Sequence, residues 1–178
     1  MPVIDPALLE RATAVRLLVL DVDGVLTDGK LYFDPDGNEL KAFNTRDGFG
    51  MKMLQRSGVE VAVITARNSA AVTHRMQQLG IRHLFQGCEN KLEAFMQLLS
   101  TTGLDAEQVC YAGDDWIDLP ILIRAGLAVA VANAEPQVKE RAHWVTRQRG
   151  GDGAVREICN LILTAQGRDR SILDEILT

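Results

Sequence analysis

The chain has 178 residues, of which 47% are hydrophobic and 24% are charged, and its formal net charge is −5. This length suits one domain, 1–178, with a sizeable buried core, and the proportions are ordinary for a globular protein. The acidic balance argues against nucleic acid as a partner, and no apolar run approaches the roughly 18 residues of a membrane span.

The amino-terminal stretch MPVIDPALLERATAVR carries acidic residues and lacks the basic-then-apolar pattern of an export signal. The three cysteines, Cys88, Cys110 and Cys159, are widely spaced in apolar contexts and form no metal-ligand pair. We therefore expect reduced, buried thiols and a cytoplasmic protein.

Short apolar runs without polar alternation predict buried strands at 15–22, 59–65, 108–113 and 127–133. Helical patterns occupy 47–57, 68–79, 90–101, 115–125, 136–142 and 153–165, with Asn68 as a plausible N-cap and Gly80 and Gly103 as stops. Because strands alternate with helices, the sequence predicts a three-layer α/β fold, a Rossmann-like parallel sheet flanked by helices.

The segment KLYFDPDGNELKAF at 30–43 breaks this alternation, because two short strand-like runs flank a strong hairpin signal at 34–38. The hairpin follows the first strand, so it should protrude near the carboxyl edge of the sheet, where open α/β sheets bind ligands. It carries more apolar surface than an isolated hairpin keeps in water. We expect it to form an oligomer interface, the alternative being a decorative surface hairpin.

Asp21 and Asp23 end the first strand, with Val22 between them. Residues two apart in an extended chain point to the same side, so both carboxylates should face one spot. Like charges this close repel unless a cation binds there or one carboxyl is protonated, and Mg²⁺ suits such oxygen ligands. Two acids in a solvated loop are the alternative.

Polar residues follow three more strand ends. Thr65 ends the 59–65 strand just before a helix. Its hydroxyl and the N–H groups at the helix start can bind an anion, the alternative being that Thr65 is a simple helix cap. Lys91 opens a helix where the dipole favours acids, so a bound anion would explain it, a solvated surface lysine being the alternative. Asp118 comes one helical turn after Asp114, so one acid can bind a metal while the other orients the site.

In chain order these features are DVDGVLTDG, ITAR, a lysine after a short strand, and GDDWIDLP. Over residues 21–120 the combination resembles the haloacid dehalogenase-like phosphotransferase superfamily in all four of its motifs. The resemblance implies that Asp21 is the nucleophile and forms an aspartyl-phosphate, and that Asp23 is the general acid/base. The phosphoryl group would be bound by Thr65 and Lys91, and Mg²⁺ by Asp21, Asp114 and the backbone carbonyl of Asp23, with Asp118 supporting the metal site.

These roles make opposite demands on two neighbouring carboxyls. Asp21 should stay ionised beside Mg²⁺ and Lys91, which offset the charge that hinders attack on an anionic phosphate. Asp23 must carry a proton to the leaving oxygen. An acid at position 23 matches the superfamily's phosphatases and mutases, whereas its dehalogenases and cation-pumping ATPases lack it.

The intervals between the motifs leave no room for a cap domain, and an open site discriminates poorly among leaving groups. We therefore expect a neighbouring subunit to cover the site. The capless pattern, with TRDGFGMKML after the hairpin and a late GGDGAVREICNLIL, is similar to the 3-deoxy-D-manno-octulosonate 8-phosphate phosphatase family over about 15–165. The resemblance implies a homotetramer with a central barrel of hairpins, sites at subunit interfaces, and a role in lipopolysaccharide inner-core sugar biosynthesis.

The same resemblance implies that Arg67, Gly48 and Arg75 meet the substrate or the adjoining subunit. Arg67 suits a sugar-acid carboxylate through its planar donor fork, an exposed arginine at a helix start being the alternative. The segment 150–153 is either a loop at the rim of the site or a helix-start turn. The tail 167–178 is amphipathic and charged, and family tails can reach the next subunit's site.

The expected function is Mg²⁺-dependent hydrolysis of 3-deoxy-D-manno-octulosonate 8-phosphate, and two other functions compete with it. A 2-keto-3-deoxy-nonulosonate 9-phosphate phosphatase would differ only in a few lid contacts, so the sequence leaves eight- and nine-carbon substrates open. A non-catalytic tetramerisation module would share the fold but would have a decayed site, whereas all the site residues are present in this sequence.

Overall fold

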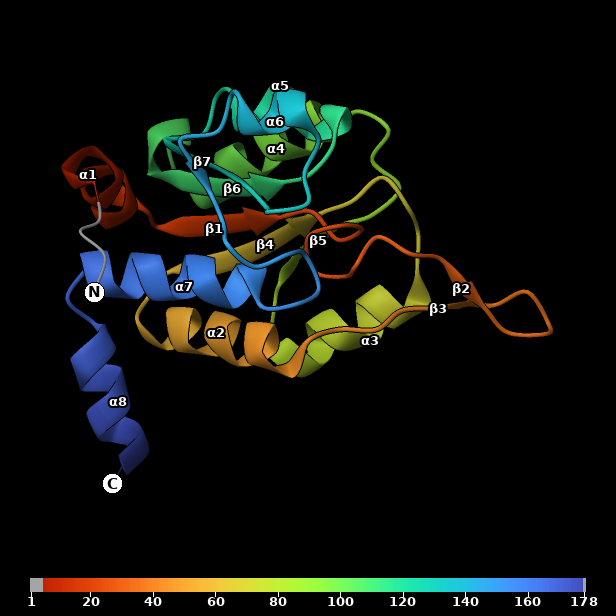
Figure 1. Cartoon of the computed structure of the whole chain (residues 1–178), viewed down its shortest axis with the longest axis horizontal. Helices are drawn as coiled ribbons and strands as arrows, with labels where there is room; N and C mark the ends of the chain where they lie inside the picture. Colours follow the sequence, from red (N-terminus) through yellow and green to blue (C-terminus); the bar gives the residue numbers. More distant parts are fainter. Residues whose placement is uncertain (1–4, 178) are drawn as a thin grey trace.

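The computed structural model describes residues 5–177 and has the predicted three-layer α/β architecture (Figure 1). Six parallel strands form one sheet in the order β5-β4-β1-β6-β7-β8. Their bounds are β1 Leu17–Leu20, β4 Glu60–Ile64, β5 His83–Phe85, β6 Val109–Gly113, β7 Leu127–Ala130 and β8 Trp144–Val145. β1 lies inside the sheet with all its residues buried, so the loop that follows it starts from the rigid centre of the fold.

Helices cover both faces of the sheet (Figure 1). One face carries α2 (Thr45–Arg56), α3 (Ala70–Leu79) and α7 (Ala154–Ala165), and the other carries α4 (Lys91–Thr102), α5 (Leu119–Leu122) and α6 (Pro136–Lys139). α1 (Pro6–Ala14) packs on α7 at the end opposite the hairpin, and α8 (Asp169–Leu177) extends away from the body. None of the helices within residues 5–177 is long and apolar enough to cross a membrane.

The four predicted strands are confirmed with shorter bounds, and the structure adds β5 and β8 at the two edges of the sheet. These edge strands are short and only partly buried, so they lack the apolar run that reveals the inner ones. The predicted 115–125 helix is a 3₁₀ turn (Trp116–Asp118) followed by the short α5. Pro120, which cannot donate a backbone hydrogen bond, stands in the first turn of α5, where helices tolerate proline.

The predicted helix stops at Gly80 and Gly103 are confirmed, because both residues adopt the left-handed conformation after α3 and α4. The predicted N-cap at Asn68 is wrong. α3 begins at Ala70 with Ser69 at the cap position, and no side chain caps it. The Ser69 N–H instead donates to the Gln86 side chain at 2.9 Å, a contact that depends on a loop distant in sequence.

The 30–43 hairpin is confirmed and protrudes from the body (Figure 1). β2 (Tyr32–Phe33) and β3 (Glu39–Leu40) pair antiparallel, with Tyr32 opposite Leu40. The carboxylate of Asp34 holds the turn by accepting the backbone N–H groups of Asp36 and Asn38. The apolar side chains of the hairpin at 31, 32, 33 and 40 are between 41% and 58% exposed, and no cap domain covers the carboxyl edge within residues 5–177.

The amino terminus of α7 is capped by a residue from another helix. The cap position is Gly153, which has no side chain, and the buried Asp47 of α2 accepts the backbone N–H of Arg156 at 2.7 Å instead. Gly50 permits this approach, since a Cβ there would lie 3.2 Å from the Cβ of Cys159. Asp47 therefore joins α2 to the start of α7.

We predict that Asp47→Ala lowers the free energy of unfolding by about 1–2 kcal/mol, the usual cost of a lost helix cap. The matched variant Asp47→Asn keeps an oxygen acceptor and should lose less than about half of that amount. Urea denaturation followed by circular dichroism measures both. Equal losses for the two variants, or no loss for Asp47→Ala, would contradict a capping role.

Candidate active site

The carboxyl ends of β1, β4 and β6 bring predicted site residues to one edge of the sheet. β1 pairs with β4 on one side and β6 on the other, so Asp21 lies between the strand ends that lead to Thr65 and Asp114. The backbone N–H of Asp21 donates to the carbonyl of Ala112 at 3.2 Å, which extends the sheet ladder to the acid. Asp21 is 5% exposed and Thr65 is 2% exposed, so neither is a solvated loop residue.

Lys91, the first residue of α4, bridges two carboxylates. Its Nζ lies 2.8 Å from Asp21 Oδ1 and 2.7 Å from Asp118 Oδ1, and its side chain is 1% exposed. Burial alone would lower the pKa of this ammonium, but the two carboxylates outweigh burial and raise the pKa. Lys91 is therefore a buried cation, and the alternative of a solvated surface lysine is excluded.

Asp118 is fully buried and its oxygens already accept four hydrogen bonds. Besides Lys91, the Tyr111 hydroxyl donates to Oδ1 at 2.5 Å, and the backbone N–H groups of Asp114 and Asp115 donate to Oδ2 at 2.9 and 3.2 Å. These bonds use the acceptor sites of a carboxylate. Asp118 therefore orients Lys91 and the loop that carries Asp114.

Asp114, unlike Asp118, has a carboxylate oxygen without a hydrogen-bond partner among the described residues. This oxygen, Oδ1, is buried. Burial, and then the carboxylates of Asp21 and Asp118, raise the pKa of Asp114 to about 8. Gly24 makes room for this side chain, since it has a φ of 95° and a Cβ there would overlap the Asp114 carboxylate.

Asp21, Asp114 and Asp118 each present a carboxylate oxygen within 4.8 Å of the others. Three carboxylates face one buried ammonium, and such an excess of negative charge requires protons or a cation. Burial and the charge of Asp118 raise the pKa of Asp21 to about 7, against the opposing effect of Lys91. The all-oxygen donor set and the unpartnered Asp114 oxygen fit a hard divalent cation such as Mg²⁺, which would also keep Asp21 ionised.

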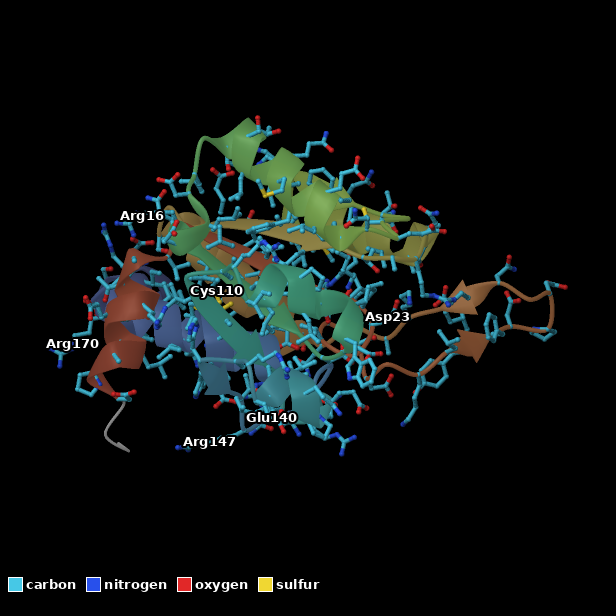
Figure 2. The ribbon with its side chains drawn as sticks, turned by 90° about the horizontal axis from the view of Figure 1, so that it is seen from above. Arg16, Asp23, Cys110, Glu140, Arg147 and Arg170 are labelled. Carbon is cyan, nitrogen blue, oxygen red and sulfur yellow. The ribbon has the colours of Figure 1, made fainter. Side chains whose placement is uncertain are left out.

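Asp23 lies where the hairpin joins the body (Figure 2). Its carboxylate contacts different cations from that of Asp21. The strand ends at Leu20, and the carbonyl of Val22 accepts backbone N–H groups from residues 25–27, so the chain turns here. The prediction assumed an extended chain after the strand, which this turn replaces, and that the two carboxylates serve one site stays a prediction.

Lys41 of the hairpin contacts Asp23, and Glu39 contacts Lys41; neither residue was predicted from the sequence. Lys41 forms ion pairs with Asp23 and Glu39, and Arg67 forms one with Glu39 at 3.3 Å and a looser one with Asp23 at 3.9 Å. The signal for Lys41 and Glu39 was the alternation in Glu39-Leu40-Lys41, which points the two charges to one side of the strand. For Tyr111, also missed, the signal was a hydroxyl inside an apolar strand.

Gly48 and Arg75 lie next to each other between α2 and α3. A Cβ on Gly48 would overlap the guanidinium of Arg75, so this glycine lets the two helices approach. Arg75 is half-buried and donates to the side chain of Gln78 at 3.4 Å. No hydrogen bond or ion pair within residues 5–177 joins either residue to Asp21 or Lys91, and their contact with a substrate stays a prediction.

The segment 150–153 packs against the loop that follows β1. A Cβ on Gly150 would overlap the carbonyl of Gly24, and the Gly151 N–H donates to the carbonyl of Val25 at 3.0 Å. The segment also leads directly into α7. Both of the interpretations that the sequence left open therefore apply: the segment borders the site loop and it starts a helix.

Comparisons with known proteins agree with this geometry. Residues 86–158 match the haloacid dehalogenase-like hydrolase family. The chain is 50% identical over 167 residues to the 3-deoxy-D-manno-octulosonate 8-phosphate phosphatase of Yersinia pestis, covering 94% of this chain and 89% of the relative. It is 52% identical over 160 residues to the phosphatase of the same name from Escherichia coli K12, covering 90% and 85%.

A solved structure of the 3-deoxy-D-manno-octulosonate 8-phosphate phosphatase from Moraxella catarrhalis contains a magnesium ion, a phosphate ion and a KDO molecule. The present structure superposes on it with a TM-score of 0.93 at 38% sequence identity, covering 95% of this chain and 97% of that one. The similarity therefore extends over nearly the whole length of both chains.

The raised pKa values of Asp21 and Asp114 predict that Mg²⁺ stabilises this protein more at high pH. The ordinary carboxyl value is 3.8, and the metal-free folded values are about 7 and about 8. Between these limits the two carboxyls bind more protons in the folded state than in the unfolded state, so their contribution to metal-free stability is greatest at low pH and is lost as pH rises through about 7 and about 8. The increase in melting temperature caused by Mg²⁺ should therefore be larger at about pH 8 than at about pH 5.5.

Asp114→Asn should lose most of this Mg²⁺ effect, because it removes a charge beside the unpartnered oxygen. Asp36→Asn, at the exposed hairpin turn, is the matched control and should keep it. Differential scanning fluorimetry with Mg²⁺ or EDTA at both pH values measures the shift. An equal Mg²⁺ shift at the two pH values would contradict competition between protons and the metal.

Proposed function

Because the chain belongs to the 3-deoxy-D-manno-octulosonate 8-phosphate phosphatase family within the haloacid dehalogenase-like hydrolases, we propose that it releases phosphate from 3-deoxy-D-manno-octulosonate 8-phosphate. It is a phosphoric monoester hydrolase with Mg²⁺ as cofactor. The observation that carries this function is the Lys91-bridged carboxylate cluster at the carboxyl edge of the sheet.

Asp21 is the nucleophile of this proposal. Its carboxylate attacks phosphorus, the bond to the sugar oxygen breaks, and an aspartyl-phosphate forms. Lys91 holds the carboxylate at 2.8 Å and offers positive charge to the incoming phosphoryl oxygens, together with the buried hydroxyl of Thr65. Asp21, Asp114 and the backbone carbonyl of Asp23 would hold Mg²⁺, which would supply the remaining neutralisation of charge.

Asp23 is the general acid in the first half of the reaction and the general base in the second. In the first half its carboxyl donates a proton to the leaving sugar oxygen. In the second half the resulting carboxylate accepts a proton from the water that attacks the aspartyl-phosphate, which frees phosphate and regenerates Asp21. Asp23 lies in the loop after β1, where the hairpin joins the body. This position supports the role, since the sugar must extend outward from the buried phosphoryl site.

Arg67 is the proposed partner of the sugar-acid carboxylate. Its side chain is 45% exposed beside Asp23, so its planar donor group is open to a ligand at the mouth of the site. Gly48 and Arg75 remain proposed contacts through an adjoining subunit. The nine-carbon relative, 2-keto-3-deoxy-nonulosonate 9-phosphate, is the second candidate substrate, and kcat/KM for the two sugar phosphates decides between them.

We further propose a homotetramer in which a neighbouring subunit completes each site. The exposed apolar residues of the hairpin support this assembly, because a patch of this kind in water marks an interaction surface. A cytoplasmic location is proposed with it, on the support of the free cysteines.

Asp21→Asn should reduce Mg²⁺-dependent phosphate release from 3-deoxy-D-manno-octulosonate 8-phosphate by at least about 1000-fold, because the amide cannot attack phosphorus. The circular dichroism spectrum should stay that of the folded protein. A phosphate-release assay with purified wild type and variant measures the effect. Substantial turnover by the folded variant would contradict the mechanism, and an inactive wild type would favour the non-catalytic alternative.

Deletion of residues 31–42 should lower the mass of the protein in solution from that of a tetramer, because it removes the exposed apolar side chains of the hairpin. Phe33→Glu, which adds one charge to the same surface and leaves the chain length unchanged, should act in the same direction. Size-exclusion chromatography with light scattering gives the masses. An unchanged mass for the deletion would remove the hairpin from the interface.

A further inference from the structure

Lys41 is a buried ammonium for which the reaction above has no use. Its side chain is 1% exposed, and it forms ion pairs with the carboxylates of Asp23 and, at 2.7 Å, of Glu39. The two carboxylates hold the ammonium from two sides, so a movement of Lys41 would break one or both ion pairs.

This ion pair occupies one oxygen of Asp23 and leaves the other available. Lys41 contacts Oδ1, whereas Oδ2 lies 3.9 Å from Nε of Arg67, which is beyond hydrogen-bond distance. The Asp23 side chain is 22% exposed, so a ligand can approach it. Lys41 therefore selects which oxygen of Asp23 faces outward.

The contact also joins Asp23 to the hairpin. Lys41 directly follows β3, and in this extended segment Glu39 and Lys41 point to one side and Leu40 to the other. Glu39 and Lys41 face Asp23 and Arg67, while Leu40 is 54% exposed on the outer surface. The segment 39–41 thus carries both an exposed apolar side chain and the cation that holds Asp23.

We propose that Lys41 is a positioning residue for the phosphatase reaction, which fixes Asp23 so that its Oδ2 meets the leaving oxygen. The inference rests on the proposed function, since it takes Asp23 as the proton donor. Positioning of a proton donor matters most for a poor leaving group. A sugar alkoxide needs the proton as the ester bond breaks, whereas nitrophenolate leaves without it.

The test is Lys41→Met, assayed with Mg²⁺ on 3-deoxy-D-manno-octulosonate 8-phosphate and on 4-nitrophenyl phosphate. The value of kcat/KM should fall about 100-fold for the sugar ester and less than about 5-fold for the nitrophenyl ester, as expected when general acid catalysis is impaired. Lys52→Met, at an exposed lysine of α2, is the matched control and should change neither value. Equal losses on the two esters, or no loss on either, would overturn the proposal.

A double-mutant cycle tests whether Lys41 acts through Asp23. In an Asp23→Asn background, Lys41→Met should cause little further loss on the sugar ester, and a second loss as large as the first would overturn the inference. If circular dichroism shows that Lys41→Met is unfolded, Lys41→Arg takes its place. It keeps the charge but moves it, so a selective loss on the sugar ester supports the proposal, and equal or absent losses overturn it.

The same assays separate this inference from the proposed function. A wild type that fails on the sugar-acid phosphate but hydrolyses a simple alkyl phosphate would contradict the proposed substrate. The comparison of the alkyl ester with the nitrophenyl ester would then still decide the role of Lys41, with the same expected difference in loss between the two esters.

Discussion

The buried bridge from Lys91 to Asp21 and Asp118 is the interaction on which the rest of the site depends. It ties the end of β1 to the start of α4 and to the loop after β6, three segments far apart in sequence. Tyr111 and two backbone N–H groups fix Asp118, so Lys91 has one defined position. One ammonium does not balance three carboxylates, and a divalent cation would neutralise the residual negative charge.

The turn at Val22 gives the neighbouring residues Asp21 and Asp23 different ion-pair partners. It sends the carboxylate of Asp21 inward to Lys91 and that of Asp23 outward to Lys41. The inner site is built by the loops at the sheet edge and the start of α4, whereas the surroundings of Asp23 depend on the hairpin. Under the proposed function, the inner cluster would bind the phosphoryl group, and the sugar would lie beside the hairpin, an element with an exposed apolar surface.

Most of the fold and the inner site could be predicted because both follow from strong local signals. Apolar runs gave the four inner strands, and the rule that ligands bind at carboxyl strand ends placed Asp21, Thr65, Lys91 and Asp114 on one edge. The edge strands β5 and β8 were missed because they are short and partly exposed. The direction of Asp23 and its pairing with Lys41 depend on a turn and on a distant strand, which local periodicity does not encode.

A crystal structure of the protein with Mg²⁺ and phosphate tests the central claim most directly. We expect the metal to contact oxygens of Asp21 and Asp114, while Asp118 keeps its bonds to Lys91 and Tyr111. A metal bound directly by Asp118, with Lys91 released from both carboxylates, would contradict it.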